Sequence, residues 1–414
     1  MWPICARKCP SSIRAPPATS QHGETGCTIP VAGVWHTKGV ENADFIVIGA
    51  GVAGASVGYF LARHARVVVL EREPHPGYHS TGRSAALFME TYGPEQVRAL
   101  TRASRPFFEN PPAGFVEYPL LSRRGTLVVA TRSQERQLEE YWEEISSSAT
   151  LTRRLKPSET FELVPVIREG EVFGSVYEPH ACDIDVHALH QGYLRELRRR
   201  GGVVHCDCEV TRLERDGGGW RVFAGDKVFA APVVLNAAGA WADVVAKLAG
   251  VTPIGLEPRR RSAFIFAPPE GVATAPWPAV MGAEEDWYFK PEAGMLLGSP
   301  ANADPVAPHD VQAEELDVAL AIDRIESITT LSINRPSRVW AGLRSFVSDG
   351  ALVGGFDPRA AGFFWVAAQG GYGIQTSAAM GEACATLARG LPFPQHIADA
   401  GLSAEMLSPS RLTQ

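Results

Sequence analysis

The chain has 414 residues and a formal net charge of −7, with 45% hydrophobic and 21% charged residues, a composition typical of a globular protein. The acidic balance excludes nucleic acid as the main partner, because no basic surface is available to bind phosphates. There is no run of about 18 or more apolar residues, so no transmembrane segment is predicted.

Residues 1–41 are rich in Pro, Ser, Thr and Cys and show no hydrophobic period, so we predict a disordered extension there. The segment lacks the apolar stretch of a secretory signal. The seven cysteines are scattered along the chain without a Cys-x-x-Cys pair. They indicate reduced thiols in a cytoplasmic protein, and no metal site is predicted.

The stretch DFIVIGAGVAG, residues 44–54, predicts a buried strand, a glycine turn and the start of a helix. Gly49 permits the tight turn, Gly51 lets the backbone approach a pyrophosphate, and Gly54 lets the helix pack closely on the sheet. The helix is expected to begin at Val52 and Ala53. The start of a helix offers unpaired N–H groups to phosphates.

A second apolar run, residues 67–70, leads into Glu71 and Arg72. Glu71 lies 22 residues after Gly49, where the acid that binds a ribose is expected. Together the two runs predict a β-α-β unit that binds a dinucleotide. The loop that follows, residues 76–87, is rich in hydrogen-bond donors and is suited to a flavin through Gly82, Arg83 and Ser84.

Beyond residue 94 the sequence changes character, and no glycine fingerprint is found up to residue 180. Hydrophobic spacing predicts helices over 96–108, 133–147 and 185–200. It also predicts strands over 125–130, 171–177, 203–210, 220–223 and 259–266, and a hairpin over 287–298.

Two later stretches return to the nucleotide-binding pattern. In the first, a buried strand at 233–236 runs into small residues that let the backbone pass close to the glycine turn, and we select Ala238, Gly239 and Trp241. The second, residues 363–377, reads as a strand, a glycine-rich turn and a helix starting near Gly373. Its site candidates are Gly370, Gly371, Tyr372, Gly373, Ile374 and Gln375.

These motifs resemble the D-amino-acid oxidase-like family of FAD flavoenzymes from about residue 42 to the C-terminus, and within that family the bacterial D-arginine dehydrogenases. The resemblance rests on five separate stretches that keep their order, namely 76–86, 260–266, 294–304, 340–344 and 367–375. It implies non-covalently bound FAD, held by the glycine turn and by the residues selected above.

The fold expected from the resemblance is α/β, with a Rossmann-like FAD-binding domain and an interleaved antiparallel-sheet domain for the substrate. We assign residues 42–93, 181–255 and 340–414 to the FAD-binding domain. Residues 94–180 and 256–339 are assigned to the substrate-binding domain.

The resemblance further implies oxidative deamination of a D-amino acid. Hydride passes from Cα to flavin N5, and the released imine hydrolyses to a 2-oxo acid and ammonia. Arg344 would bind the carboxylate with two parallel hydrogen bonds. The Tyr288 hydroxyl would donate a further hydrogen bond, and Arg261 would add positive charge to the pocket. Tyr92 would form an aromatic wall over the site, and the backbone at Gly371 would accept a hydrogen bond from the substrate amine.

Three positions depart from the D-arginine dehydrogenase pattern. Leu87 stands where the pattern has His, Met89 where it has Thr, and Thr126 where it has a Glu that would meet a guanidinium substrate. We therefore expect neutral or apolar D-amino acids to be preferred, because a buried cation without a partner is costly. Glu90 remains an alternative source of the missing acid.

Two other functions stay open. The same scaffold could oxidise glycine, sarcosine or another secondary amine, or the chain could bind flavin without catalysis. Oxidase and dehydrogenase are not distinguished by any motif. The resemblance implies a quinone or respiratory-chain component as electron acceptor, and a peripheral position at the inner membrane is the alternative to a purely cytoplasmic one.

Overall fold

The computed structural model describes residues 39–146 and 151–413. Residues 1–38 of the predicted extension lie outside this part. The prediction of an extension over residues 1–41 is wrong at its C-terminal end. Val40–Asn42 form strand β1, which pairs in parallel with β13 (Lys227–Ala231). This pairing uses backbone groups and depends on a strand almost 190 residues away, so the local composition does not indicate it.

A six-stranded sheet carries the glycine turn. Its neighbouring strands are parallel, except for one antiparallel pair at the edge formed by the last two strands. Near-continuous apolar runs form such strands because both faces of the sheet are covered. The order is β10 (Val203–His205), β3 (Val67–Leu70), β2 (Phe45–Ile48), β14 (Val233–Asn236), β22 (Phe363–Ala367) and β21 (Val353–Phe356).

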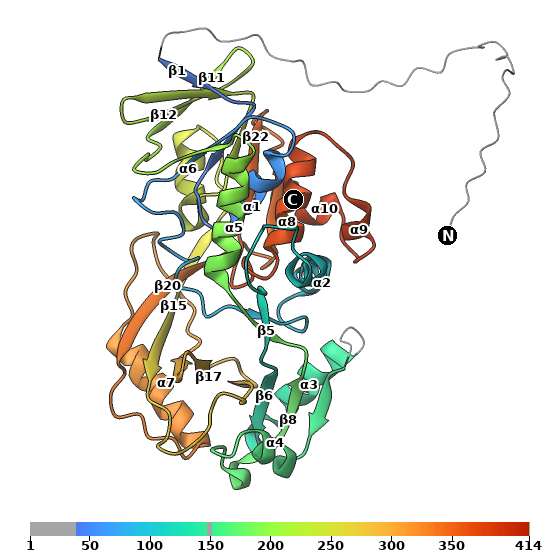
Figure 1. The fold of residues 1–414 in the computed structure, drawn as a ribbon, viewed down its shortest axis with the longest axis vertical. Coiled ribbons are helices and arrows are strands. Elements are labelled where there is room, and N and C mark those ends of the chain that lie inside the picture. Colours follow the sequence, from blue (N-terminus) through green and yellow to red (C-terminus); the bar gives the residue numbers. More distant parts are fainter. Residues whose placement is uncertain (1–38, 147–150, 414) are drawn as a thin grey trace, which may run out of the picture. The chain divides into compact units, whose positions relative to one another are not determined.

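Side chains alternate between the two faces of this sheet. Val47 and Val69 face a core shared with α1 (Val52–Leu61), α5 (Val186–Arg199) and α8 (Ser377–Ala388). Ile46 and Val68 face a second core. Figure 1 shows α1 between α5 and α8, and both helices contact it. The second core is closed by α6 (Ala242–Leu248) and by a four-stranded sheet of β1, β13, β12 (Gly219–Ala224) and β11 (Arg212–Asp216).

A nine-stranded sheet forms the other large element. Its order is β19 (Asp304–Pro305), β15 (Glu257–Phe266), β18 (Met295–Ser299), β17 (Tyr288–Glu292), β16 (Ala279–Gly282), β6 (Thr126–Thr131), β8 (Val172–Glu178) and β7 (Arg153–Leu155), with β20 (Arg338–Phe346) paired along β15. The helices packed on it are α3 (Glu135–Ser146), α4 (Pro157–Leu163) and α7 (Glu315–Ile328).

Smaller elements complete the described chain. A three-stranded sheet joins β4 (Leu87–Phe88), β9 (Cys182–Ile184) and β5 (Leu121–Arg123). Helix α2 (Glu95–Glu109) packs on α8. The short helices α9 (Gln395–Ala398) and α10 (Ala404–Leu407) lie near the C-terminus. None of the described helices combines the length and apolar composition needed to cross a membrane.

The predicted α/β fold class, with a parallel nucleotide-type sheet and a second interleaved sheet, is confirmed. Three details differ. The second sheet contains one parallel pair, β6–β16. The strand predicted over 203–210 ends at His205, because Asp207 adopts φ +49 and turns the chain. The helix predicted to start near Gly373 is α8, which begins at Ser377 after a series of turns. The assignment of residue ranges to two domains remains a prediction.

Gly54 gives a test of the packing between α1 and the sheet. A Cβ at this position would lie 1.9 Å from the Gly49 carbonyl oxygen. We expect Gly54→Ala to destabilise the apoprotein by about 1–3 kcal/mol, as overpacking does elsewhere, and to lower its thermal unfolding midpoint. Gly170→Ala is the matched control, since its added Cβ meets nothing within 4 Å. Equal midpoints for the two variants would contradict the packing argument.

Candidate functional site

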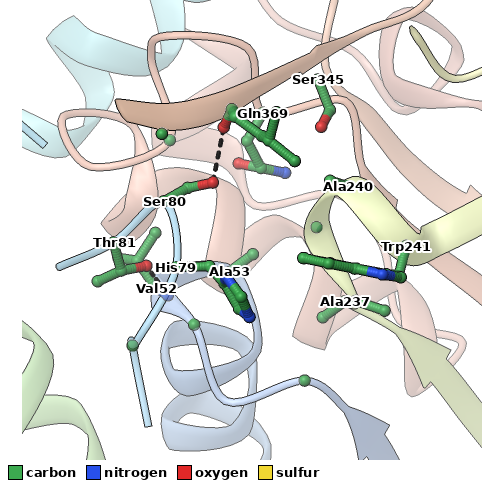
Figure 2. A pocket seen from close by; sticks show the side chains of 18 of the residues that line it. Val52, Ala53, His79, Ser80, Thr81, Ala237, Ala240, Trp241, Ser345 and Gln369 are labelled. Atoms are coloured by element: carbon green, nitrogen blue, oxygen red, sulfur yellow. Dashed lines mark hydrogen bonds between the residues drawn. The ribbon is translucent and has the colours of Figure 1, made fainter. Parts of the chain in front are cut away.

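A cavity with about 1670 Å³ of empty space, open to solvent, lies at the carboxyl ends of the parallel strands. Figure 2 shows Val52 and Ala53 at the start of a helix on one side of it, and Ala237 and Trp241 on the other. We call it the first cavity. Crevices at this edge of parallel sheets are the usual binding sites of nucleotides.

The glycine turn is pressed against the end of β14. Gly49 has φ +100, and a Cβ there would lie 2.5 Å from the Ala237 carbonyl oxygen, so no other residue fits. Gly49 and Gly51 line the first cavity. Gly54 does not line it, and its role is the contact between α1 and the turn.

Side chains outside the turn hold its backbone. Glu71 accepts the Ala50 N–H through Oε2 at 2.8 Å, and its side chain is buried while bordering the first cavity. Thr81 Oγ1 accepts the Val52 N–H at 3.0 Å. Sequence reasoning selected Glu71 but missed Thr81, whose one available signal was its hydroxyl in the donor-rich loop.

The donor-rich loop is closed and tied to β20. Gly82 donates its N–H to the Gly77 carbonyl at 2.8 Å, and a Cβ on Gly82 would lie 2.7 Å from that oxygen. Arg83 donates to the carbonyls of Val311 and Ala341, each at 3.1 Å. The guanidinium of Arg83 therefore braces the loop, although its side chain also borders the first cavity. Ser80 donates to the Leu343 carbonyl at 2.6 Å, the dashed line in Figure 2.

A flat aromatic wall lies at one end of the first cavity. The Trp241 ring has the Arg72 guanidinium 4.5 Å from its centroid and the His79 ring at 4.7 Å. Ala238 and Gly239 lie three and two residues before Trp241, and Gly239 has φ +56. Arg72, Ala238, Gly239 and Trp241 all line the first cavity.

The glycine-rich turn before α8 forms the other end. Gly370 has φ +52, and a Cβ on Gly371 would lie 2.7 Å from Arg344 Nη1, so the turn closely approaches that guanidinium. Gln375 does not cap α8. Its amide bonds both backbone groups of Met89 and the Thr101 hydroxyl, which ties the turn to the segment after β4.

Arg344 and Arg261 lie where the first cavity meets a second one, which holds about 700 Å³. They come from β20 and β15, which pair antiparallel with Arg261 opposite Gly342. Arg344 donates to the Tyr92 hydroxyl at 3.2 Å, and Arg261 Nε is buried without a partner. No salt bridge joins either guanidinium to an acid in the part of the chain that the structure describes.

Both guanidiniums carry charge at neutral pH. Burial, together with the neighbouring charge of Arg344, lowers the pKa of Arg261 to about 10, which is still well above 7. Two adjacent, half-buried cations without acid partners are suited to bind an anion, and we call the pair the anion site, because a charge withdrawn from water is stable only when it is paired. Tyr288 borders the same junction.

The second cavity is bordered by Leu87 and Met89, two of the positions that depart from the D-arginine pattern. Thr126 does not border it and is buried in β6. Glu90, the alternative acid, pairs with Arg105 and also does not border it. Sequence reasoning missed further lining residues whose approach depends on strand pairing. Met281 lies in β16, and the others lie in segments that adjoin strands, namely Glu285, Trp287 and Ala301.

The structure thus gathers most of the predicted site residues around two adjoining cavities. The predicted residues that line the first cavity are Gly49, Gly51, Val52, Ala53, Glu71, Arg72, Arg83, Ser84, Ala238, Gly239, Trp241, Arg261, Tyr288, Arg344, Gly370, Gly371, Gly373 and Ile374. Those that line the second are Ser84, Tyr92, Arg261, Tyr288, Arg344, Gly371, Ile374 and Gln375. Gly54, Gly82 and Tyr372 line neither, and the Tyr372 ring packs on Tyr92.

A sequence model of the FAD dependent oxidoreductase (DAO) family matches residues 44–387. The chain belongs to this family. The FAD-dependent oxidoreductase domain-containing protein 1 of Bos taurus is 25% identical over 402 residues, covering 84% of this chain and 81% of the bovine protein. The mitochondrial sarcosine dehydrogenase of Homo sapiens is 25% identical over 345 residues, covering 78% of this chain but only 37% of the human protein.

Solved structures share the fold of this FAD-dependent oxidoreductase. Glycine oxidase from Geobacillus kaustophilus has a TM-score of 0.75 at 22% identity, covering 86% of this chain and 97% of that one. L-proline dehydrogenase from P. horikoshii has a TM-score of 0.76 at 19% identity, covering 90% and 98%. The family prediction is confirmed. The narrower resemblance to D-arginine dehydrogenases is not supported, since the sarcosine, glycine and L-proline enzymes are named for other amines.

The residues of the first cavity fit FAD, the family's cofactor. The Glu71 carboxylate, at the end of β3, is placed for a ribose, and the N-terminus of α1 is placed for phosphates. The turn before α8 and the guanidiniums of Arg261 and Arg344 line the end of the first cavity that is far from Trp241. We expect the residues that line the first cavity to hold FAD, with the anion site beyond its far end.

The anion site can be tested by charge removal. We expect Arg344→Gln to weaken binding of benzoate to the FAD-loaded protein about 10- to 100-fold, because a charge-assisted pair of hydrogen bonds is lost. The measurement is the change in flavin absorbance during a benzoate titration. Arg338→Gln removes an exposed cation from the same strand and should leave the affinity unchanged. Equal affinities in the two variants would contradict the assignment.

Proposed function

We propose that this FAD-dependent oxidoreductase oxidises the amine of a small α-amino acid, with glycine, sarcosine and related secondary amines as the first candidates. One observation carries the proposal, namely the pair of half-buried guanidiniums, Arg344 and Arg261, which lie where the two cavities meet and form no salt bridge among the described residues. An α-amino acid supplies the carboxylate that such a pair requires.

The relatives support an amine as the reacting group. Their names include sarcosine dehydrogenase, dimethylglycine dehydrogenase and glycine oxidase, so each is named for a small amino acid or its N-methyl derivative. The identities are near 25% or lower, and the sarcosine relative is much longer than this chain. These likenesses therefore indicate a reaction class rather than one substrate.

Each residue at the junction has a role in the proposed reaction. Arg344, held by the Tyr92 hydroxyl, binds the substrate carboxylate, and Arg261 adds the second positive charge. The Tyr288 hydroxyl supplies a further donor. Gly371 lies against Arg344, so its backbone lies where the substrate amine would be held. Bound FAD supplies the acceptor for the hydride that leaves the substrate carbon.

A second candidate is a neutral D-amino acid with an apolar side chain. The specific observation in its favour is the lining of the second cavity by Leu87, Met89 and Trp287, with Met281 beside them. This lining would bury either an apolar side chain on Cα or an apolar substituent on nitrogen. It would disfavour a cationic side chain, because Glu285 is the sole acid that borders this cavity among the described residues and its side chain is exposed.

Anaerobic reduction of the flavin distinguishes these candidates. We expect sarcosine, N,N-dimethylglycine, glycine or L-proline to bleach the flavin absorbance, and D-Leu or D-Met to do so faster than D-Arg. The readout is the rate of bleaching at saturating amine. If none of these compounds reduces the flavin, the chain binds FAD without this activity. If D-Arg reduces it fastest, the role given to the apolar lining is wrong. A peroxide assay in air then separates oxidase from dehydrogenase.

The apolar lining predicts a change of preference on substitution. Leu87→Glu places a carboxylate in the second cavity, where it can pair with a cationic side chain. We expect the kcat/KM ratio of D-Arg to D-Leu to rise about tenfold or more. Leu87→Gln has the same shape without the charge and should leave the ratio within about threefold of the parent protein. Equal ratios in the two variants would show that Leu87 does not contact the substrate side chain.

A further inference from the structure

Both polar groups of the Ala50 backbone are held by side chains from distant elements. The Ala50 N–H donates to Glu71 Oε2 at 2.8 Å. The Ala50 carbonyl lies 2.8 Å from His190 Nε2. Ala50 stands between Gly49 and Gly51 in the glycine turn, where the backbone has more freedom than elsewhere. The bond to Glu71 fixes the Gly49–Ala50 peptide, and the bond to His190 fixes the Ala50–Gly51 peptide.

His190 reaches the turn from α5 and lines neither cavity. Its side chain is 4% exposed, and burial lowers its pKa, so the ring is neutral at pH 7. Because a carbonyl can only accept, Nε2 carries the proton in this arrangement. The ring also lies under the donor-rich loop, since a Cβ on Gly77 would meet His190 Cε1 at 2.9 Å.

The bond to the carbonyl determines where the next N–H points. In a planar trans peptide, the carbonyl of one residue and the N–H of the next point in opposite directions. No cis peptide is found among the described residues. With the Ala50 carbonyl turned toward His190, the Gly51 N–H points away from α5. Gly51 lines the first cavity and is the N-cap of α1, so its N–H is directed to the side where phosphates bind.

We propose that His190 is a positioning residue for the cofactor, which orients the Ala50–Gly51 peptide so that the Gly51 N–H faces the diphosphate of FAD. This role goes beyond the reaction proposed above and does not depend on which amine is oxidised. The His190 ring therefore makes two contacts, one with the Ala50 carbonyl and one with Gly77 of the donor-rich loop.

The test compares variants that keep or remove the donor. His190→Leu fills similar apolar space without a hydrogen bond, and leaves the Ala50 carbonyl unsatisfied. We expect its FAD dissociation constant to rise about tenfold or more, as for other buried acceptors that lose their donor. His190→Gln can place an amide N–H near the position of Nε2 and should stay within about threefold of the parent protein. His187→Leu, from the exposed face of the same helix, is the matched control and should bind FAD as the parent does.

FAD affinity is measured by titrating the apoprotein and following the quenching of flavin fluorescence. The thermal midpoint of each apoprotein is measured in parallel. A purely structural role would lower the midpoint and the affinity together in both His190 variants. The proposal expects His190→Gln to recover affinity even if its apoprotein is no more stable than that of His190→Leu. It is overturned if His190→Leu binds FAD as tightly as the parent, or if His190→Gln fails to recover affinity while its apoprotein folds normally.

Discussion

The site depends on one constraint, which is that four parallel strands end at the same edge of one sheet. The residues that directly follow β2, β3, β14 and β22 all line the first cavity, and they are Gly49, Glu71, Ala237 and Ala368. Parallel strands bring their carboxyl ends together whatever the distance between them in sequence. Residues more than 300 positions apart therefore meet around one ligand, and the contact of Gly49 with Ala237 leaves no room for a side chain between the two turns.

Glycine-rich turns at this edge need support. Glycine lets the backbone approach a ligand closely, but it also leaves the backbone more conformational freedom. The support comes from side chains that the ligand does not need to touch. Thr81 holds the first N–H of α1, and Arg83 ties the donor-rich loop to β20. The result is a preorganised cavity, in which little ordering remains to be done when a cofactor binds.

The glycine turn could be predicted from the sequence because its geometry is local. Three glycines, a buried run and an acid at a fixed distance specify it without tertiary information. Arg344 was accessible only through the resemblance, since an arginine in a strand has no local signal. Met281 and Trp287 could not be foreseen. Met281 reaches the second cavity because β16 pairs in parallel with β6, about 150 residues earlier, and no short-range pattern encodes that pairing. Trp287 lies between β16 and β17, so its place depends on the same pairing.

Two neighbouring arginines on β15 show why the anion site is not an accident of composition. Side chains alternate across a strand, so Arg260 and Arg261 face opposite sides of the sheet. Arg260 is surrounded by Asp304, Glu314 and Asp317. Arg261, one residue later, lies half-buried beside Arg344, and its Nε is buried without a partner. Acids thus pair with Arg260, yet none forms a salt bridge with Arg261 among the described residues. An unpaired buried cation costs several kcal/mol, and such a cost is expected at a site whose counter-ion is the ligand.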